Sequence, residues 1–87
     1  MEERQAEDGE QILLEIANTQ MPFGRYAGRY LVDLPEAYVL WFREKGFPGG
    51  RLGVLMENLL EIKVNGLEKM VRPLCRDAAY RRRRFPG

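Results

Sequence analysis

Residues 19–46 read TQMPFGRYAGRYLVDLPEAYVLWFREKG, and this stretch decides the fold. In its first half, Gly24 and Gly28 are flanked on both sides by aromatic and β-branched residues. This pattern is typical of two short strands joined by a tight turn, in which a glycine supplies the positive φ. We therefore expect a short β-hairpin with strands at 20–23 and 29–32.

The second half of the stretch predicts a helix that ends near Lys45. Asp33 is followed three residues later by Glu36, which is a variant of the capping box, and Pro35 suits a first helical turn. Gly46 is the expected stop. Because apolar side chains lie nearly all round this helix, we expect it to be buried deep in the fold.

Upstream of this stretch, an apolar stripe with helical spacing predicts a helix over 9–18. Its members are Ile12, Leu13, Ile16 and Ala17.

Downstream, the apolar positions 52, 55, 56, 59, 62, 66 and 70 predict a long helix from about Arg51 to Val71, which Pro73 ends. The Asn65–Gly66 pair could break that helix or form a turn. Since the stripe keeps its phase across Gly66, we expect one continuous helix.

Together these elements predict a small α+β domain: an N-terminal helix, a short β-hairpin, a buried helix and a long C-terminal helix. With 87 residues there is room for one domain, which we place at 9–75. Residues 1–8 form an acidic arm, and residues 76–87 form a basic tail that we expect to be disordered. The net charge of +1 hides this polarity, because the first twenty residues carry −5 and the last seventeen +5.

The composition excludes most familiar enzyme chemistry, because the chain has no histidine and one cysteine. The chain can form no histidine triad, no histidine-ligated zinc site and no internal disulfide, and we expect no enzyme, no cofactor and no metal. Glu57, Glu61 and Glu68 share a helix but read as a solvated face. We expect Cys75 to be a structural thiol in a reducing, cytoplasmic setting. No stretch approaches the roughly 20 apolar residues of a membrane span, so we expect no membrane association.

The hairpin carries the candidate functional site. Arg25 and Arg29 crowd with Phe23 and Tyr26 around the glycines, and guanidinium groups beside exposed rings suit phosphate contacts with base stacking. The alternative is that the two rings belong to the core and the two arginines are solvated.

Two further features are open to two interpretations each. Trp41 and Tyr38 could form a stacking platform for a base, although core packing is the simpler interpretation. The densest charge is the tail run Arg81, Arg82, Arg83 and Arg84. Such a run binds polyanions, or serves as a mobile solubilising tail, or contacts the acidic first twenty residues.

Residues 11–75 resemble a bacterial family of small proteins described as putative quorum-sensing-regulated virulence factors. The distinctive pieces are PFGRYAGR, DLPEAYVLWF, KGFP and EIKVNGLE. That family implies no catalytic residue.

A shorter pattern is similar to the C-terminal module of exodeoxyribonuclease X-like proteins, and this similarity implies work near nucleic acid. The pattern falls on Pro22, Phe23, Gly24, Arg25, Tyr26, Gly28, Arg29, Pro35, Tyr38 and Trp41. Arg25 replaces a common lysine and keeps its charge, whereas Ala27 replaces a further lysine and loses one.

Two functions follow as hypotheses. One is a small non-catalytic module that binds DNA or RNA through the basic and aromatic hairpin. The other is a protein-interaction or homodimerisation module that uses the leucine- and methionine-rich helix or the hairpin edge.

Overall fold

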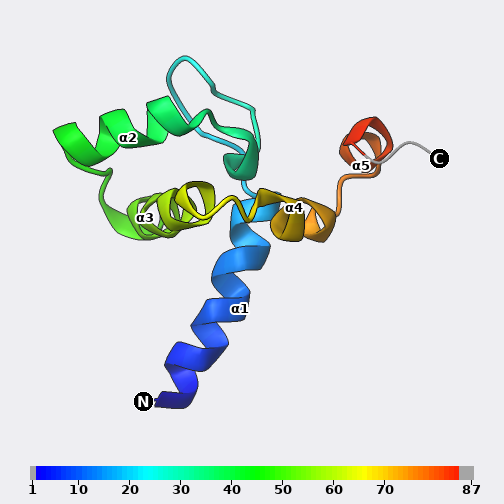
Figure 1. The fold of residues 1–87 in the computed structure, drawn as a ribbon, viewed down its shortest axis with the longest axis horizontal. Coiled ribbons are helices and arrows are strands. Elements are labelled where there is room, and N and C mark those ends of the chain that lie inside the picture. The colour runs from blue at the N-terminus through cyan, green and yellow to red at the C-terminus, as the bar shows by residue number, and fades with distance from the viewer. Residues whose placement is uncertain (1, 85–87) are drawn as a thin grey trace.

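The computed structural model describes residues 2–84 of the chain, and the side chains of residues 9–82. Over that range the elements are all helical (Figure 1). The α-helices are α1 (Glu2–Asn18), α2 (Glu36–Lys45), α3 (Gly50–Val64), α4 (Glu68–Val71) and α5 (Ala78–Arg84), and the 3-10 turns are η1 (Leu31–Asp33) and η2 (Arg72–Leu74). The predicted α+β class is therefore wrong.

The expected hairpin is reduced to one isolated antiparallel bridge, between Gln20 and Tyr30. Pro22 has no amide hydrogen to extend the pairing, and on the other side the chain winds into η1 directly after Tyr30. The Met21 N–H donates to the Arg29 carbonyl at 2.8 Å, and the Met21 carbonyl accepts the Gly28 N–H at 2.8 Å. Residues 21–30 thus form a closed loop, which we call the 21–30 loop.

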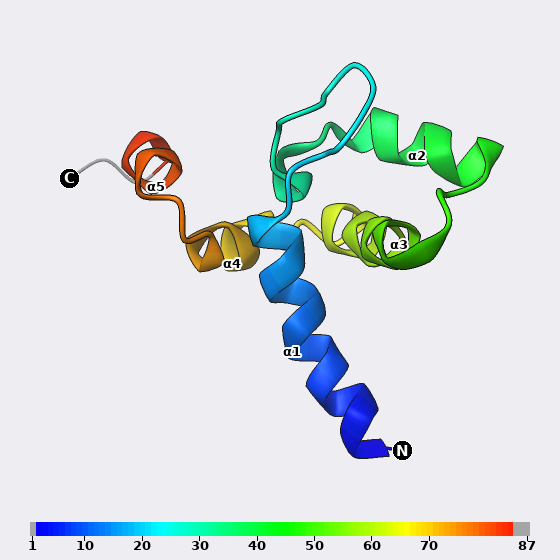
Figure 2. The same ribbon diagram turned by 180° about the vertical axis from the view of Figure 1, so that it is seen from behind.

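Helix α1 confirms the predicted N-terminal helix and its end at Asn18, but it begins at Glu2 instead of Gly9. The acidic segment that we treated as an arm therefore has a helical backbone from Glu2 onward. Carboxylates near a helix N-terminus are favourable, because they face its positive dipole end. Figures 1 and 2 show that this half of α1 extends away from the other helices, whereas Ile16 and Ala17 near its other end lie in the core.

Helix α2 also forms where predicted, and the Gly46 N–H closes it on the Phe42 carbonyl at 2.6 Å with φ at +108°. Two details were wrong. Pro35 is the N-cap residue, one position before the helix, and no side chain caps the helix start. The Asp33 carboxylate, which we expected to cap it, pairs with Arg72 at 2.9 Å.

The same helix is not deeply buried. It packs against α3 at the edge of the molecule, and Val39 is its one fully buried residue (Figure 1).

The long continuous helix is also wrong, because α3 ends at Val64. The Leu67 N–H donates to the Ile62 carbonyl at 2.9 Å and the Gly66 N–H to the Lys63 carbonyl at 3.1 Å, with Gly66 at φ +66°. This bond pair is a Schellman motif, which terminates a helix. After this turn the next helix presents a different face to the core than the predicted stripe, so that Val71 is buried while Met70 is 70% exposed.

The residues after η2 are ordered around Asp77. Its carboxylate accepts the Ala79 and Tyr80 N–H groups at 2.9 and 3.3 Å and so caps α5. Tyr80 and Cys75 are buried, and Cys75 is a free thiol, as predicted. The expected disordered tail is thus helical over 78–84, and residues 85–87 lie outside the described part of the chain.

The core gathers residues from the inner half of α1, from α2 to α5, from η1 and from the connecting segments, whereas η2 contributes no buried residue. Its buried members are Ile16, Ala17, Met21, Leu31, Val32, Leu34, Val39, Leu55, Met56, Leu59, Leu60, Ile62, Val71, Cys75 and Tyr80. Among the described helices, none is long and apolar enough to cross a bilayer.

Candidate functional site

The 21–30 loop holds its basic residues outward. Gly24 and Gly28 adopt φ of +79° and +90°, which side chains with a Cβ rarely adopt, and the Ala27 and Arg29 N–H groups close two consecutive turns at 3.1 and 3.0 Å. The glycines therefore serve the turn, and Arg25 and Arg29 are exposed.

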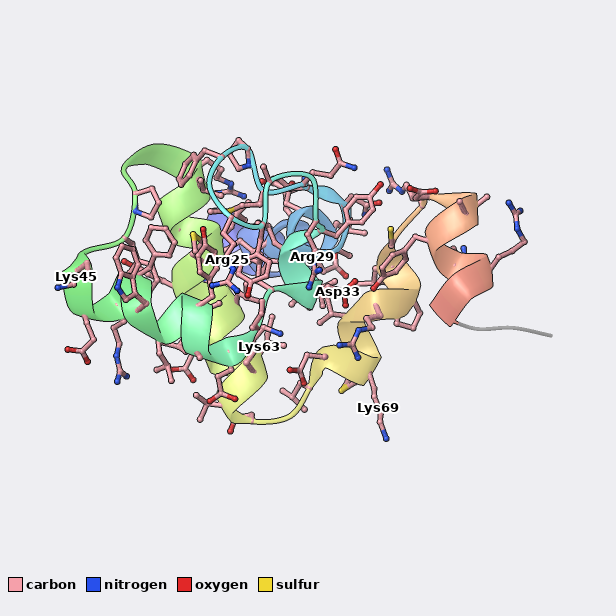
Figure 3. The ribbon with its side chains drawn as sticks, turned by 90° about the horizontal axis from the view of Figure 1, so that it is seen from above. Arg25, Arg29, Asp33, Lys45, Lys63 and Lys69 are labelled. Carbon is pink, nitrogen blue, oxygen red and sulfur yellow. The ribbon has the colours of Figure 1, made fainter. Side chains whose placement is uncertain are left out.

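Tyr26 gathers the two arginines. The Cζ of Arg25 lies 5.5 Å from the centroid of the Tyr26 ring, and the Cζ of Arg29 lies 5.1 Å from it. Each contact is a cation–π interaction, which orients a guanidinium without neutralising it. Figure 3 shows both arginines near the middle of the molecule, with Lys45 and Lys69 toward its sides. The loop thus concentrates two positive charges around one ring.

The loop is anchored at both of its sides by rings. Tyr26 meets Tyr38 of α2 edge to face at 4.7 Å, and Tyr30 meets Tyr80 of α5 at 5.4 Å. The Tyr30 hydroxyl donates to Asp77 at 2.8 Å, and this hydrogen bond raises the pKa of Tyr30 above its ordinary value. These contacts hold the loop in place before any ligand arrives.

Beside the loop lies an open depression of about 370 Å3. Its lining is aromatic and apolar with one basic edge, and consists of Arg25, Tyr26, Pro35, Ala37, Tyr38 and Trp41. Trp41 is 52% exposed, so the core-packing interpretation is wrong for this residue. Its ring contacts Phe42 at 5.0 Å, and Phe42 in turn contacts Tyr38 at 5.2 Å. The aromatic rings of α2 and the loop form one connected surface.

Phe23 belongs to the same surface but stands at its margin. It is 44% exposed and meets Phe42 at 6.4 Å. Tyr26 is partly buried. The alternative in which both rings lie in the core is therefore wrong for Phe23 and half right for Tyr26.

The tail arginines form a separate basic surface. Arg81 and Arg82 are exposed on α5 and line a shallow groove with Arg76. Arg83 and Arg84 continue the helix, and their side chains lie outside the described part of the chain. Helix α5 lies at the opposite end of the molecule from α2 (Figures 1 and 2). The structure thus does not bring the tail arginines to the depression.

A buried ionic cluster was missed by the sequence analysis. The Lys63 side chain is 5% exposed, and its Nζ donates to the Val32 carbonyl at 3.0 Å and lies 3.4 Å from the Glu68 carboxylate. Burial lowers the pKa of Lys63, although Glu68 opposes that shift. Next to it, Arg72 bonds Asp33 at 2.9 Å. Lys63 follows the buried Leu59 by four residues and so lies on the same face of the helix. This spacing could have predicted its burial.

This cluster fixes η1 and hence the site. Val32 and Asp33 both belong to η1, which connects the 21–30 loop to α2. Burial disfavours the charged guanidinium of Arg72 and so lowers its pKa, but the hydrogen bond to Asp33 opposes this effect, and the pKa is raised overall. Two cations on α3 and η2 therefore hold the segment that joins the two halves of the depression.

Within the described residues, no group of three histidine, cysteine or acidic residues is placed to hold a metal ion. Glu57 and Glu61 are exposed on α3, while Glu68 faces Lys63. The depression contains no nucleophile paired with a base. What its arrangement can do is bind: a flat ring can stack against its aromatic side while an anion meets its basic edge.

The comparisons place the chain among known sequences. Residues 9–74 match the family described as "Putative quorum-sensing-regulated virulence factor". The chain is 60% identical over 65 residues to the "Uncharacterized protein YpeB" of Escherichia coli K12, an alignment that covers 74% of this chain and 90% of that protein. The YpeB protein of Escherichia coli O157:H7 matches at the same identity and coverage. No solved structure matches the chain significantly. None of these matches bears on the similarity to exodeoxyribonuclease X-like proteins, which stays an expectation.

Proposed function

The chain belongs to the family of putative quorum-sensing-regulated virulence factors, and from that premise we propose that it is a small non-catalytic module that binds nucleic acid. The observation that supports this most directly is the pair Arg25 and Arg29, gathered around Tyr26 at the edge of an aromatic depression. Guanidinium groups bind phosphate through charge and paired N–H donors, and adjacent rings offer faces to bases.

The net charge of +1 means that the whole chain does not attract polyanions strongly. Binding would instead depend on where the charges lie. Two arginines held by one ring retain their charge and lose less side-chain freedom on binding than two free ones would. We expect the module to act in the cytoplasm, where nucleic acid is found and a lone thiol such as Cys75 stays reduced.

Fluorescence anisotropy with labelled DNA and RNA oligonucleotides across a salt series tests this function. The informative variant is the double substitution Arg25→Glu, Arg29→Glu. Its matched control is Arg81→Glu, Arg82→Glu, which removes the same charge from the separate surface on α5. Circular dichroism checks that each variant keeps its helices.

We expect the loop variant to lose binding and the α5 variant to keep most of it. Where the loop variant still binds, the slope of log K against log salt should be smaller in magnitude than that of the wild type by about 1.4 to 1.8. This difference corresponds to the loss of two phosphate contacts. If the α5 variant alone loses binding, the attraction is generic to the arginine run and the proposal is wrong. Absence of binding at about 50 mM salt and micromolar protein would end it as well.

A second candidate function, protein interaction or homodimerisation, is favoured by a different observation. Three large apolar side chains near the α3–α4 turn are exposed: Val64 by 62%, Leu67 by 42% and Met70 by 70%. Exposed apolar patches are typical of interaction surfaces. Sedimentation equilibrium of the wild type and of Met70→Lys tests it: a dimer that the substitution dissociates supports this candidate, and a monomer at all concentrations excludes homodimerisation.

A further inference from the structure

We propose that the depression accepts single-stranded nucleic acid, with one unpaired base stacked against the indole of Trp41 and the neighbouring phosphates held by Arg25 and Arg29. This inference rests on the proposed function and adds the form of the nucleic acid and the residue that recognises it.

The stacking role falls to Trp41 because Tyr26 is already occupied. Tyr26 already contacts two guanidinium groups and the Tyr38 ring at 4.7 Å, so its ring interacts with side chains of the protein itself. Trp41 has the Phe42 ring nearly perpendicular to it at 5.0 Å and leaves 52% of its surface to solvent. A large exposed ring in a depression is the arrangement that a planar ligand can complete.

The position of Trp41 is supported by a series of ring contacts. Phe42, next to it in α2, packs on Tyr38 at 5.2 Å, and Tyr38 packs on Tyr26. This chain of rings connects the indole to the loop that carries the arginines. A base at Trp41 and a phosphate at Arg25 would therefore meet parts of one connected surface, since both residues line the same depression.

This mode of binding favours a single strand over a duplex, because it needs an uncovered base face. In a duplex the base faces are covered by their neighbours, and its grooves are read by a projecting helix or β-ribbon. Here the aromatic surface is an open depression of about 370 Å3 in which Trp41 is 52% exposed, so it offers a ring face rather than an element that enters a groove. A base must leave the stack to enter, as bases of single strands do.

Trp41 is the one tryptophan of the chain, so its own fluorescence reports on the site. The probes are a 15-mer of deoxythymidine, a 15-mer of uridine and a blunt 15-base-pair duplex, each titrated into the full chain at low salt. The variants are Trp41→Leu, the conservative Trp41→Phe, and Met70→Ala as a control at an exposed apolar residue outside the depression.

We expect single strands to quench Trp41 and to bind at least about tenfold more tightly than the duplex. Measured by anisotropy, Trp41→Leu should weaken single-strand binding by about 5- to 100-fold, Trp41→Phe by less, and Met70→Ala not at all. Because the arginines remain, the salt slope of Trp41→Leu should match that of the wild type.

Three results would overturn the inference, and they can be told apart. Equal binding of duplex and single strands, with no quenching and no effect of Trp41→Leu, would leave a phosphate-binding loop without base stacking, so the proposed function would survive alone. If no probe binds at all, the proposed function and this inference fail together. A Trp41→Leu variant that binds as tightly as Trp41→Phe refutes the role of the ring even if single strands are preferred.

Discussion

Substituting Gly53 by alanine should destabilise the protein, although the same change in most helices stabilises. Gly53 lies in the first turns of α3 and is buried. A Cβ at this position would overlap the carbonyl oxygen of Pro48 and lie 3.1 Å from its carbonyl carbon. Both are backbone atoms, which cannot rotate away as a side chain does. The connection between α2 and α3 would have to move.

The magnitude follows from two opposing contributions. Alanine gains up to about 1 kcal/mol over glycine in a helix interior. Overpacking a tight contact costs about 1–3 kcal/mol, and overlap with backbone belongs at the upper end of that range. We therefore expect Gly53→Ala to lower the free energy of unfolding by about 2 kcal/mol. For a domain of this size that corresponds to a fall in Tm of roughly 10 °C.

Urea unfolding followed by far-ultraviolet circular dichroism measures this change. The matched control is Gly9→Ala in α1, where an added Cβ meets nothing within 4 Å. That variant should gain up to about 1 kcal/mol. If Gly53→Ala proves as stable as the wild type while Gly9→Ala behaves as expected, the close approach of α3 to Pro48 is not a constraint and the reasoning is refuted.

Two more predictions concern polar groups. The Asn18 side chain donates to the Leu74 carbonyl at 3.0 Å and accepts the Arg76 N–H at 2.7 Å, so Asn18→Ala should cost about 1–3 kcal/mol in urea unfolding; a loss below about 0.5 kcal/mol would contradict this. Burial lowers the pKa of Lys63, so above that lowered pKa and up to about 10.4 the unfolded chain binds more protons. The free energy of unfolding of the wild type, minus that of Lys63→Met, should therefore rise with pH through this alkaline window, whereas a flat or falling difference would disprove it.

The elements that were predicted correctly carry local signals. Helix α2 ends at Lys45, and the Gly46 N–H caps it on the Phe42 carbonyl, as the glycine indicated. The errors came where two local signals competed. Across Gly66 the apolar periodicity favoured a continuous helix, while the backbone chose the Schellman motif and moved Met70 to the surface. The predicted pairing of strands 20–23 and 29–32 likewise shrank to the Gln20–Tyr30 bridge, because the chain between them forms turns at Gly24 and Gly28.

The candidate site was predicted in part. Arg25, Tyr26 and Arg29 stand close together in sequence, and a short loop keeps such residues together, so their grouping was visible. Trp41 was expected in the core, because a large apolar ring on an apolar helix is usually buried. Its exposure depends on α2 lying at the edge of the molecule, which no local pattern indicates.

The sequence by itself determined the local conformation and the available side chains: where α2 ends, which residues the 21–30 loop carries, and that no histidine is among the 87 residues. The tertiary structure alone decided which side chains are covered. It exposed Trp41 and buried Lys63 against Val32 and Glu68, in both cases against their ordinary preference. The physical reason is that caps and turns depend on neighbours along the chain, whereas burial depends on which distant elements pack together.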